Sequence, residues 1–185
     1  MNKKLVVALI ALAVAFAVVR LSRDAAPVAD GSFLRYQQGS STVRLTFHSA
    51  DGGKYRTVVE VAQDGGPPEV ATGMTGHGET VDGLMRTGSG SYFELGPFGP
   101  LWVQPGQLKE GGSAYGSRVR EIKPWHGRDV AVVSAALGMG TALRGEWYYD
   151  VATGFLVGGM KSTAVSGPGQ GFELVEANVP GLVVP

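Results

Sequence analysis

Residues 145–159, GEWYYDVATGFLVGG, decide the fold class of this chain of 185 residues. Trp147 and Tyr149 are two positions apart, so they share one face of an extended strand while the residue between them faces the other way. Asp150 can accept hydrogen bonds from the backbone that follows it, and Gly154 can adopt the positive φ that a short loop demands. The stretch therefore predicts a β-hairpin, with a second apolar strand after the turn.

Short alternating segments of the same kind recur from residue 42 onward. Residues 42–49 (TVRLTFHS) place apolar side chains on one face and polar ones on the other, and residues 54–63 return after an Asp-Gly-Gly turn. Further strands are predicted at residues 69–75, 91–95, 117–122, 129–135, 141–150, 155–164 and 171–176. No sustained 3.6-residue apolar period follows the N-terminal segment. The sequence predicts an all-β domain of nine or ten strands, an antiparallel curved sheet, half-barrel or sandwich, preceded by one N-terminal hydrophobic helix.

The N-terminal segment is strongly apolar. Residues 5–19 (LVVALIALAVAFAVV) carry no polar group and follow a basic start. A helix of this length spans roughly 22 Å, short of a bilayer core of about 30 Å unless Arg20 snorkels to the interface. No good small-x-small cleavage site follows closely. We expect residues 1–23 to be an uncleaved membrane anchor; a cleaved signal or a buried helix are the alternatives. The anchor residues are Leu5, Leu9, Leu12, Phe16 and Val19.

Beyond the anchor, residues 24–32 (DAAPVADGS) have the composition of a linker, and residues 33–185 form the β domain. Residues 24–185 carry 12 basic and 16 acidic side chains, a net charge of −4, which is unlike a nucleic-acid-binding surface. The chain has no cysteine, which excludes disulfides, thiolate catalysis and a lipid-modified N-terminal cysteine. We expect a single-pass protein of the cell membrane with the domain outside the cytoplasm, or a secreted or periplasmic domain if the segment is cleaved.

No motif of a familiar enzyme occurs: there is no Gly-x-Ser-x-Gly elbow, His-Glu-x-x-His helix, Walker loop or dinucleotide fingerprint. His77 lies in a glycine-flanked stretch with Glu79 and Asp82 nearby, a combination that a cation or a hydrolytic reaction could use. The flanking glycines argue for an ordinary loop, because metal ligands must be held in place. We therefore expect no enzyme activity, no metal and no cofactor.

His126 is the other histidine with candidate catalytic neighbours. Asp129 follows it closely, and either Ser134 or Ser166 could complete a Ser-His-Asp set. Chains of this length often offer such combinations without using them. A hydrolase that uses His77 or His126 with neighbouring carboxylates is the alternative function.

Residues 96–106 (GPFGPLWVQPG) alternate prolines with large apolar side chains. Prolines withhold backbone donors and fix φ, so this stretch cannot be a regular central strand. Such a loop either folds back over the core or contacts a lipid, a membrane surface or another protein. The candidate contact residues for a ligand or partner are Phe98, Leu101, Trp102 and Trp125.

Residues 119–160, with a strand, an Asp-x-x-Thr-Gly turn at residues 150–154 and an apolar strand, resemble the C-terminal hairpins of bacterial envelope lipoprotein carriers of the LolA/LolB kind. In that family a half-barrel of antiparallel strands holds acyl chains. The resemblance implies a half-barrel fold and an apolar or lipid ligand.

The predicted function is a membrane-tethered extracytoplasmic β domain that acts as a binding or structural module of the cell envelope. Its partners would be the membrane, through the N-terminal helix, and an apolar ligand or an envelope protein. A third possibility is a subunit of a membrane complex, in which the helix packs through small residues at Ala8, Ala11 and Ala15.

Overall fold

The computed structural model describes residues 28–63, 65–79, 81, 100–136, 143–163 and 171–184. The predicted anchor with its five residues, the predicted strand at residues 91–95 and the candidate contact residue Phe98 lie outside these ranges. No helix within the described ranges has the length and apolar character needed to cross a membrane.

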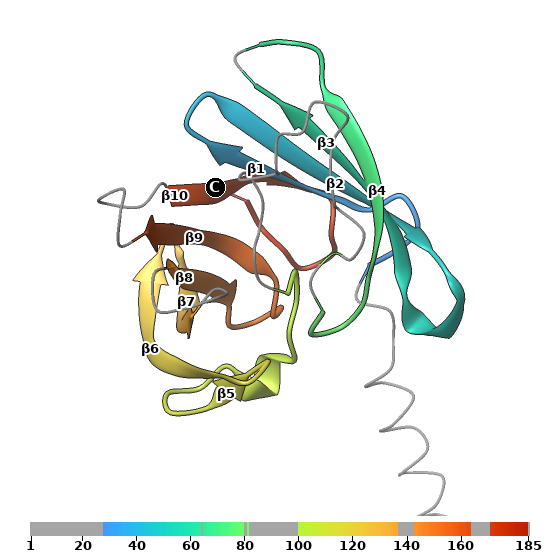
Figure 1. Ribbon diagram of the computed structural model, residues 1–185. Helices are drawn as coiled ribbons and strands as arrows, with labels where there is room; N and C mark the ends of the chain where they lie inside the picture. Colours follow the sequence, from blue (N-terminus) through green and yellow to red (C-terminus); the bar gives the residue numbers. More distant parts are fainter. Residues whose placement is uncertain are drawn as a thin grey trace, which may run out of the picture.

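Ten strands form one antiparallel sheet in the order β4-β3-β2-β1-β10-β9-β8-β7-β6-β5 (Figure 1). Strands that follow one another in the chain pair with each other, except β4 and β5. Strand β1 also pairs with β10 and so joins the first four strands to the last six. The strands are β1 (Phe33–Gln38), β2 (Ser41–Ser49), β3 (Tyr55–Ala62), β4 (Glu69–Thr75), β5 (Ser113–Ala114), β6 (Ser117–Trp125), β7 (Arg128–Ala136), β8 (Leu143–Asp150), β9 (Leu156–Thr163) and β10 (Gly171–Ala177). Two short 3₁₀ helices lie at Asp51–Gly53 and Pro105–Gln107.

The predicted all-β antiparallel fold is confirmed for the described residues, and the sheet is open, because β4 and β5 end the order without pairing with each other. The described strands form one open sheet, whereas a sandwich would have two. The sequence did not predict β1, and β6 runs to Trp125, beyond the predicted end at residue 122. Within the predicted linker, Val28 is buried, and its carbonyl oxygen accepts a hydrogen bond of 3.2 Å from Tyr55 Oη.

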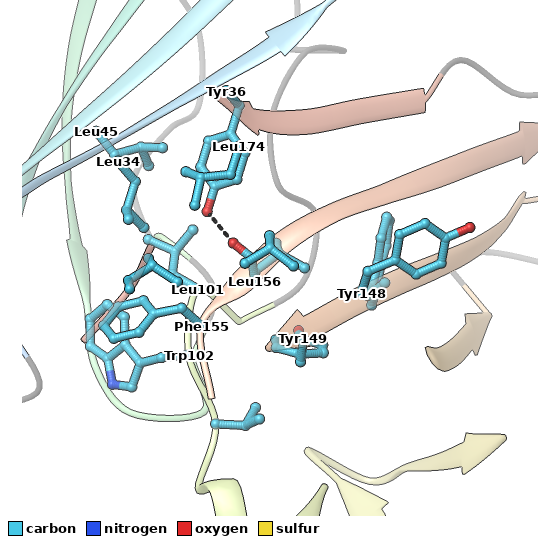
Figure 2. Packing of buried hydrophobic residues seen from close by; sticks show 14 of the residues in the cluster. Leu34, Tyr36, Leu45, Leu101, Trp102, Tyr148, Tyr149, Phe155, Leu156 and Leu174 are labelled. Atoms are coloured by element: carbon cyan, nitrogen blue, oxygen red, sulfur yellow. Dashed lines mark hydrogen bonds between the residues drawn. The ribbon is translucent and has the colours of Figure 1, made fainter. Parts of the chain in front are cut away.

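The core fills the inner side of the curve and joins both halves of the sheet. Alternate residues of β1, β2 and β3 point into it, as the period of two requires. The Tyr36 hydroxyl donates a hydrogen bond of 2.8 Å to the Leu156 carbonyl oxygen, which links β1 to β9 (Figure 2). A side chain from one half of the sheet is therefore held by the backbone of the other.

The segment at residues 100–103 crosses this inner side. Val103 N donates to Gly154 O at 2.9 Å, and Leu156 N donates to Leu101 O at 2.9 Å, so the segment pairs like a short strand with the turn before β9. The Trp102 ring lies 5.6 Å from the ring centroids of both Phe47 and Tyr55 and 5.9 Å from that of Phe155. Leu101, Trp102 and Phe155 appear together in the core in Figure 2.

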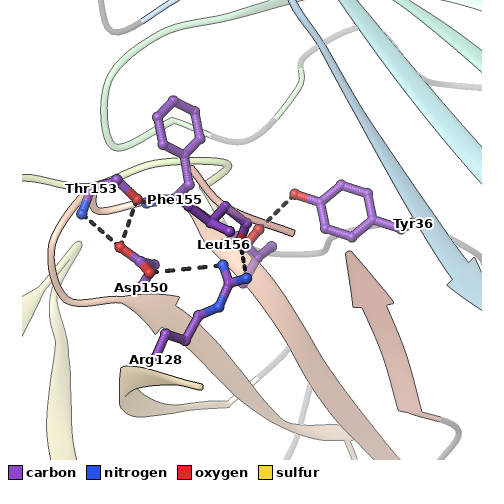
Figure 3. Close-up of polar contacts among 7 residues, drawn as sticks. Tyr36, Arg128, Asp150, Thr153, Phe155 and Leu156 are labelled. Atoms are coloured by element: carbon purple, nitrogen blue, oxygen red, sulfur yellow. Dashed lines mark hydrogen bonds and ion pairs between the residues drawn. The ribbon is translucent and has the colours of Figure 1, made fainter. Parts of the chain in front are cut away.

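The predicted hairpin at residues 145–159 is confirmed as β8, its turn and β9. The Asp150 carboxylate accepts hydrogen bonds of 2.7 Å from Thr153 N and 2.8 Å from Thr153 Oγ1 (Figure 3). Arg128 Nη1 lies 3.8 Å from Asp150 Oδ2, and both side chains are mostly buried. The same guanidinium donates to the Val183 carbonyl oxygen, so one buried charge pair fixes the turn and the C-terminal residues.

Gly154 has a φ of 78°, and a Cβ there would overlap the Val103 carbonyl oxygen. We expect Gly154→Ala to destabilise the protein by at least about 2 kcal/mol, because it adds a steric overlap to the cost of the left-handed conformation. Gly181 is the matched control, since its φ is 79° and the nearest atom to a Cβ is 3.7 Å away. Gly181→Ala should cost only about 1 kcal/mol. Denaturant unfolding of both variants measures the difference; equal losses would contradict the close docking of residues 100–103.

Burial raises the pKa of the hydroxyls of Tyr36 and Tyr149 above the ordinary value, and raises the pKa of Tyr115 to about 12. In the unfolded chain a tyrosine loses its proton near pH 10. Between these values the folded state binds more protons, so the free energy of unfolding should fall as the pH rises from about 10 to about 12, by up to about 1.4 kcal/mol per pH unit for each tyrosine. Unfolding in denaturant at several alkaline pH values measures the slope. Tyr115→Phe should make it shallower, and an unchanged slope would be inconsistent with a buried Tyr115 hydroxyl.

Candidate functional site

The hairpin between β6 and β7 presents the aromatic residues of the candidate site. Trp125 pairs with Arg128, and the two residues between them, His126 and Gly127, have φ values of 47° and 77°. Two consecutive residues with positive φ are the mark of a type I′ turn, whose twist suits an antiparallel hairpin. Histidine tolerates this conformation better than most residues. The turn therefore fixes the directions in which Trp125 and His126 leave the sheet.

Trp125 lies across the outer face of the sheet, on a glycine. A Cβ on Gly158 of β9 would be 2.7 Å from Trp125 Cη2, so only glycine leaves room for the indole in this position. The Trp125 and Tyr148 rings meet edge to face, with 5.6 Å between their centroids. Tyr148 faces away from Trp147 and Tyr149, which point into the core, because successive residues of a strand alternate. The indole is partly exposed.

Charged side chains surround these rings. Lys123 Nζ lies 4.6 Å from the centroid of the Tyr148 ring, within the range of a cation–π interaction. His126 Nε2 lies 3.2 Å from Glu173 Oε1 on β10, with both side chains a little under half exposed. We call this set the Trp125 surface; it comprises Lys123, Trp125, His126, Tyr148 and Glu173. It extends from β6 to β10 and combines a partly exposed tryptophan, a buried tyrosine ring beneath it and charges of both signs.

This composition suits binding to a protein. Tryptophan provides a large contact area at a low cost in conformational entropy and is enriched among the residues that dominate binding energies. The charges at its edge favour orientation and specificity more than affinity. The described residues of this surface hold no nucleophile beside a base.

The four predicted contact residues are not brought together. Leu101 and Trp102 are 0% and 1% exposed and belong to the inner core. This part of the proline-rich stretch therefore folds back over the core, one of the two arrangements expected for it. Trp125 lies on the outer face, and Phe98 is outside the described residues. A ligand contact by Leu101 or Trp102 stays a prediction. Sequence reasoning missed Tyr148 and Glu173 as neighbours of Trp125, and no local pattern points to them.

The candidate catalytic groups lie apart within the described ranges. His126 is at one end of β7 and Ser134 lies six residues along the strand from Arg128, about 20 Å away. His77 is exposed in the turn after β4, and near it Glu79 Oε2 lies 3.3 Å from Lys54 Nζ. No three residues among the described His, Asp and Glu gather as they would to hold a metal ion. Asp82 and Ser166 lie outside the described residues, so the hydrolase alternative stays a prediction.

No family model and no curated protein matches this chain. Among solved structures the chain is similar to MucB in complex with MucA(peri), with 18% identity and a TM-score of 0.46 over 91% of this chain and 55% of that one. It is also similar to MucB in a MucA/MucB complex of Pseudomonas aeruginosa (19% identity, TM-score 0.45, 84% and 52% of the two chains) and to MucB alone (18%, 0.45, 92% and 60%). The chain thus spans between about half and three fifths of these structures. Likeness at this level establishes neither activity nor partner.

Gly158→Ala should displace the Trp125 indole, because the new methyl group would take its place against β9. We expect acrylamide to quench the tryptophan fluorescence of this variant more strongly than that of the parent, since Trp102 and Trp147 stay buried. Gly171→Ala is the matched control on the neighbouring strand, where a Cβ would meet only ordinary contacts of 3.6 Å or more. Equal quenching in all three proteins would show that Trp125 does not rest on Gly158.

Proposed function

We propose that this chain is a binding module of the cell envelope that is tethered to the membrane by residues 1–23 and binds a protein partner outside the cytoplasm through the Trp125 surface. The tether and the location rest on the apolar N-terminal segment and its basic start. The module binds its partner and leaves it chemically unchanged. This part of the proposal rests on the lack of an enzyme motif in the sequence.

One observation carries the choice of the outer face. On the inner side, the chain's own residues 100–103 lie against the hairpin turn, and Trp102 packs between rings from β2, β3 and the residue before β9. On the outer face Trp125 is left partly exposed beside charged groups. A large aromatic ring held in place by a glycine and a turn is preorganised for contact with a partner, which lowers the entropic cost of binding.

A second candidate is an apolar or lipid ligand on the inner side, as the LolA/LolB resemblance implies. The observation that favours it is the buried indole nitrogen of Trp102, Nε1, which has no hydrogen-bond partner among the described residues. A buried donor without a partner costs free energy, and the polar end of a ligand would relieve that cost.

Photo-crosslinking in the full chain distinguishes the two candidates. We expect a benzoylphenylalanine at position 125, in cells, to form a discrete adduct with one envelope protein. The same group at Lys109, which is exposed after the second 3₁₀ helix, should form none. Solvent extraction of the purified full chain tests for a bound lipid in parallel. No adduct at position 125, together with a stoichiometric lipid, would replace the protein partner with the lipid ligand. An adduct with a cytoplasmic protein would overturn the proposed location.

A further inference from the structure

The edge strand β4 has the properties of a pairing surface. Within the described residues it pairs with β3 alone and lies at one end of the sheet, as Figure 1 shows. Its seven residues, EVATGMT, contain neither proline nor lysine, the residues that usually protect an edge from pairing. Val70 and Met74 are 59% and 38% exposed on the same face, with Thr72 between them. An edge strand of seven residues whose one charged side chain, Glu69, lies at its end and which contains no proline favours the addition of another strand.

We propose that β4 pairs antiparallel with β4 of a second copy of this chain, about a two-fold axis at Thr72. Such an axis, perpendicular to the sheet, keeps the exposed faces of both copies on the same side. Of the symmetric registers, only the one centred on Thr72 places Val70 opposite Met74 of the other copy. Pro68 has no N–H to donate and stops the ladder just before Glu69.

The side chains are self-complementary in this register. Val70 of each copy faces Met74 of the other, so two symmetry-related apolar pairs form on the exposed face. Glu69 faces Thr75 of the other copy, and no like charges stand opposite each other. The strand therefore meets its own sequence without an unfavourable cross-strand pair.

The neighbouring strand adds charge complementarity. On β3, Glu60 is beside Val70 and Arg56 is beside Met74. Across the two-fold axis, each row of the joined sheets therefore runs from Glu60 through Val70 and Met74 to Arg56 of the other copy. Opposite charges flank both apolar pairs, in two rows. A second copy of this chain supplies this pattern by symmetry, which favours it over an unrelated strand.

The full chain has no cysteine, so single cysteines report on this contact without a background. Facing residues in antiparallel strands are about 4.5 to 5.5 Å apart at Cα, within the range that a disulfide spans. We expect Thr72→Cys, in cell membranes treated with a mild oxidant, to give a disulfide-linked dimer on a non-reducing gel. Val70→Cys should not link to itself, because the two copies of residue 70 are about 13 Å apart along the strands. Ser134→Cys is the control for random collisions, because Ser134 is exposed and its strand, β7, has a paired strand on each side.

Two further measurements decide the register and the energetics. Chains with Val70→Cys and chains with Met74→Cys should crosslink when they are produced together. Val70→Lys should lower the Thr72→Cys crosslink about tenfold, because it replaces the apolar side chain that faces Met74 by a charged one, twice in each dimer. Val183→Lys, at a valine that is 76% exposed near the C-terminus, should leave it unchanged.

Three outcomes would overturn the proposal: no dimer with Thr72→Cys, a Ser134→Cys dimer of equal yield, or linkage of Thr72→Cys to a different protein only. A Val70→Cys dimer in place of the Thr72→Cys dimer would overturn the register. The result is independent of the crosslink at position 125, so failure of the Trp125 surface and failure of the β4 contact are distinguishable.

Discussion

The Trp102 ring holds the two halves of the sheet in one core. It lies edge to face against Phe47 and Tyr55 of the first half and tilted against Phe155 of the second. Apart from the pairing of β1 with β10, the strand order offers no other ladder between the halves. The curvature therefore depends on what fills the inner side, and the backbone pairing of residues 100–103 with the β8–β9 turn brings the indole there. The Tyr36 hydroxyl bonded to Leu156 is a second, smaller link of the same kind.

The filled inner side explains why we assign binding to the Trp125 surface on the outer face of the sheet. A protein that fills its inner side with its own tryptophan, leucine and valine leaves the outer face for contacts. There, strand β9 has two consecutive glycines, Gly158 and Gly159, and a Cβ on either would collide with an aromatic ring, Trp125 on one face and Phe172 on the other. The register of β8 against β9 shifts next to Gly158, between Tyr148 and Tyr149. A register shift of this kind changes the direction in which nearby side chains point. This one lies beside Tyr148, the residue that contacts Trp125.

The sequence predicted those parts of the fold that depend on neighbours along the chain. The hairpin at residues 145–159 was predictable because Asp150, Thr153 and Gly154 build their own turn, and their hydrogen bonds are local. Strand β1 was missed although it forms a local hairpin with β2 through Gly39 and Ser40; only its pairing with β10, which joins residues about 140 positions apart, has no local signal. The sequence did not decide whether Trp102 is buried or exposed, since a proline-rich loop can either cover a core or protrude from it. Trp125 was named as a candidate contact residue, whereas its neighbours Gly158 and Glu173 follow from strand register, which no local pattern specifies.

The two surfaces inferred for this protein occupy different parts of one sheet, and this has a consequence for binding. Strand β4 ends the order on one side, whereas the Trp125 surface covers β6 to β10 on the other. Pairing through β4 leaves the Trp125 surface of each copy uncovered. A dimer would then carry two identical Trp125 surfaces. When one surface is bound, the second meets its partner at a high effective concentration, so weak single contacts would add up to firm attachment.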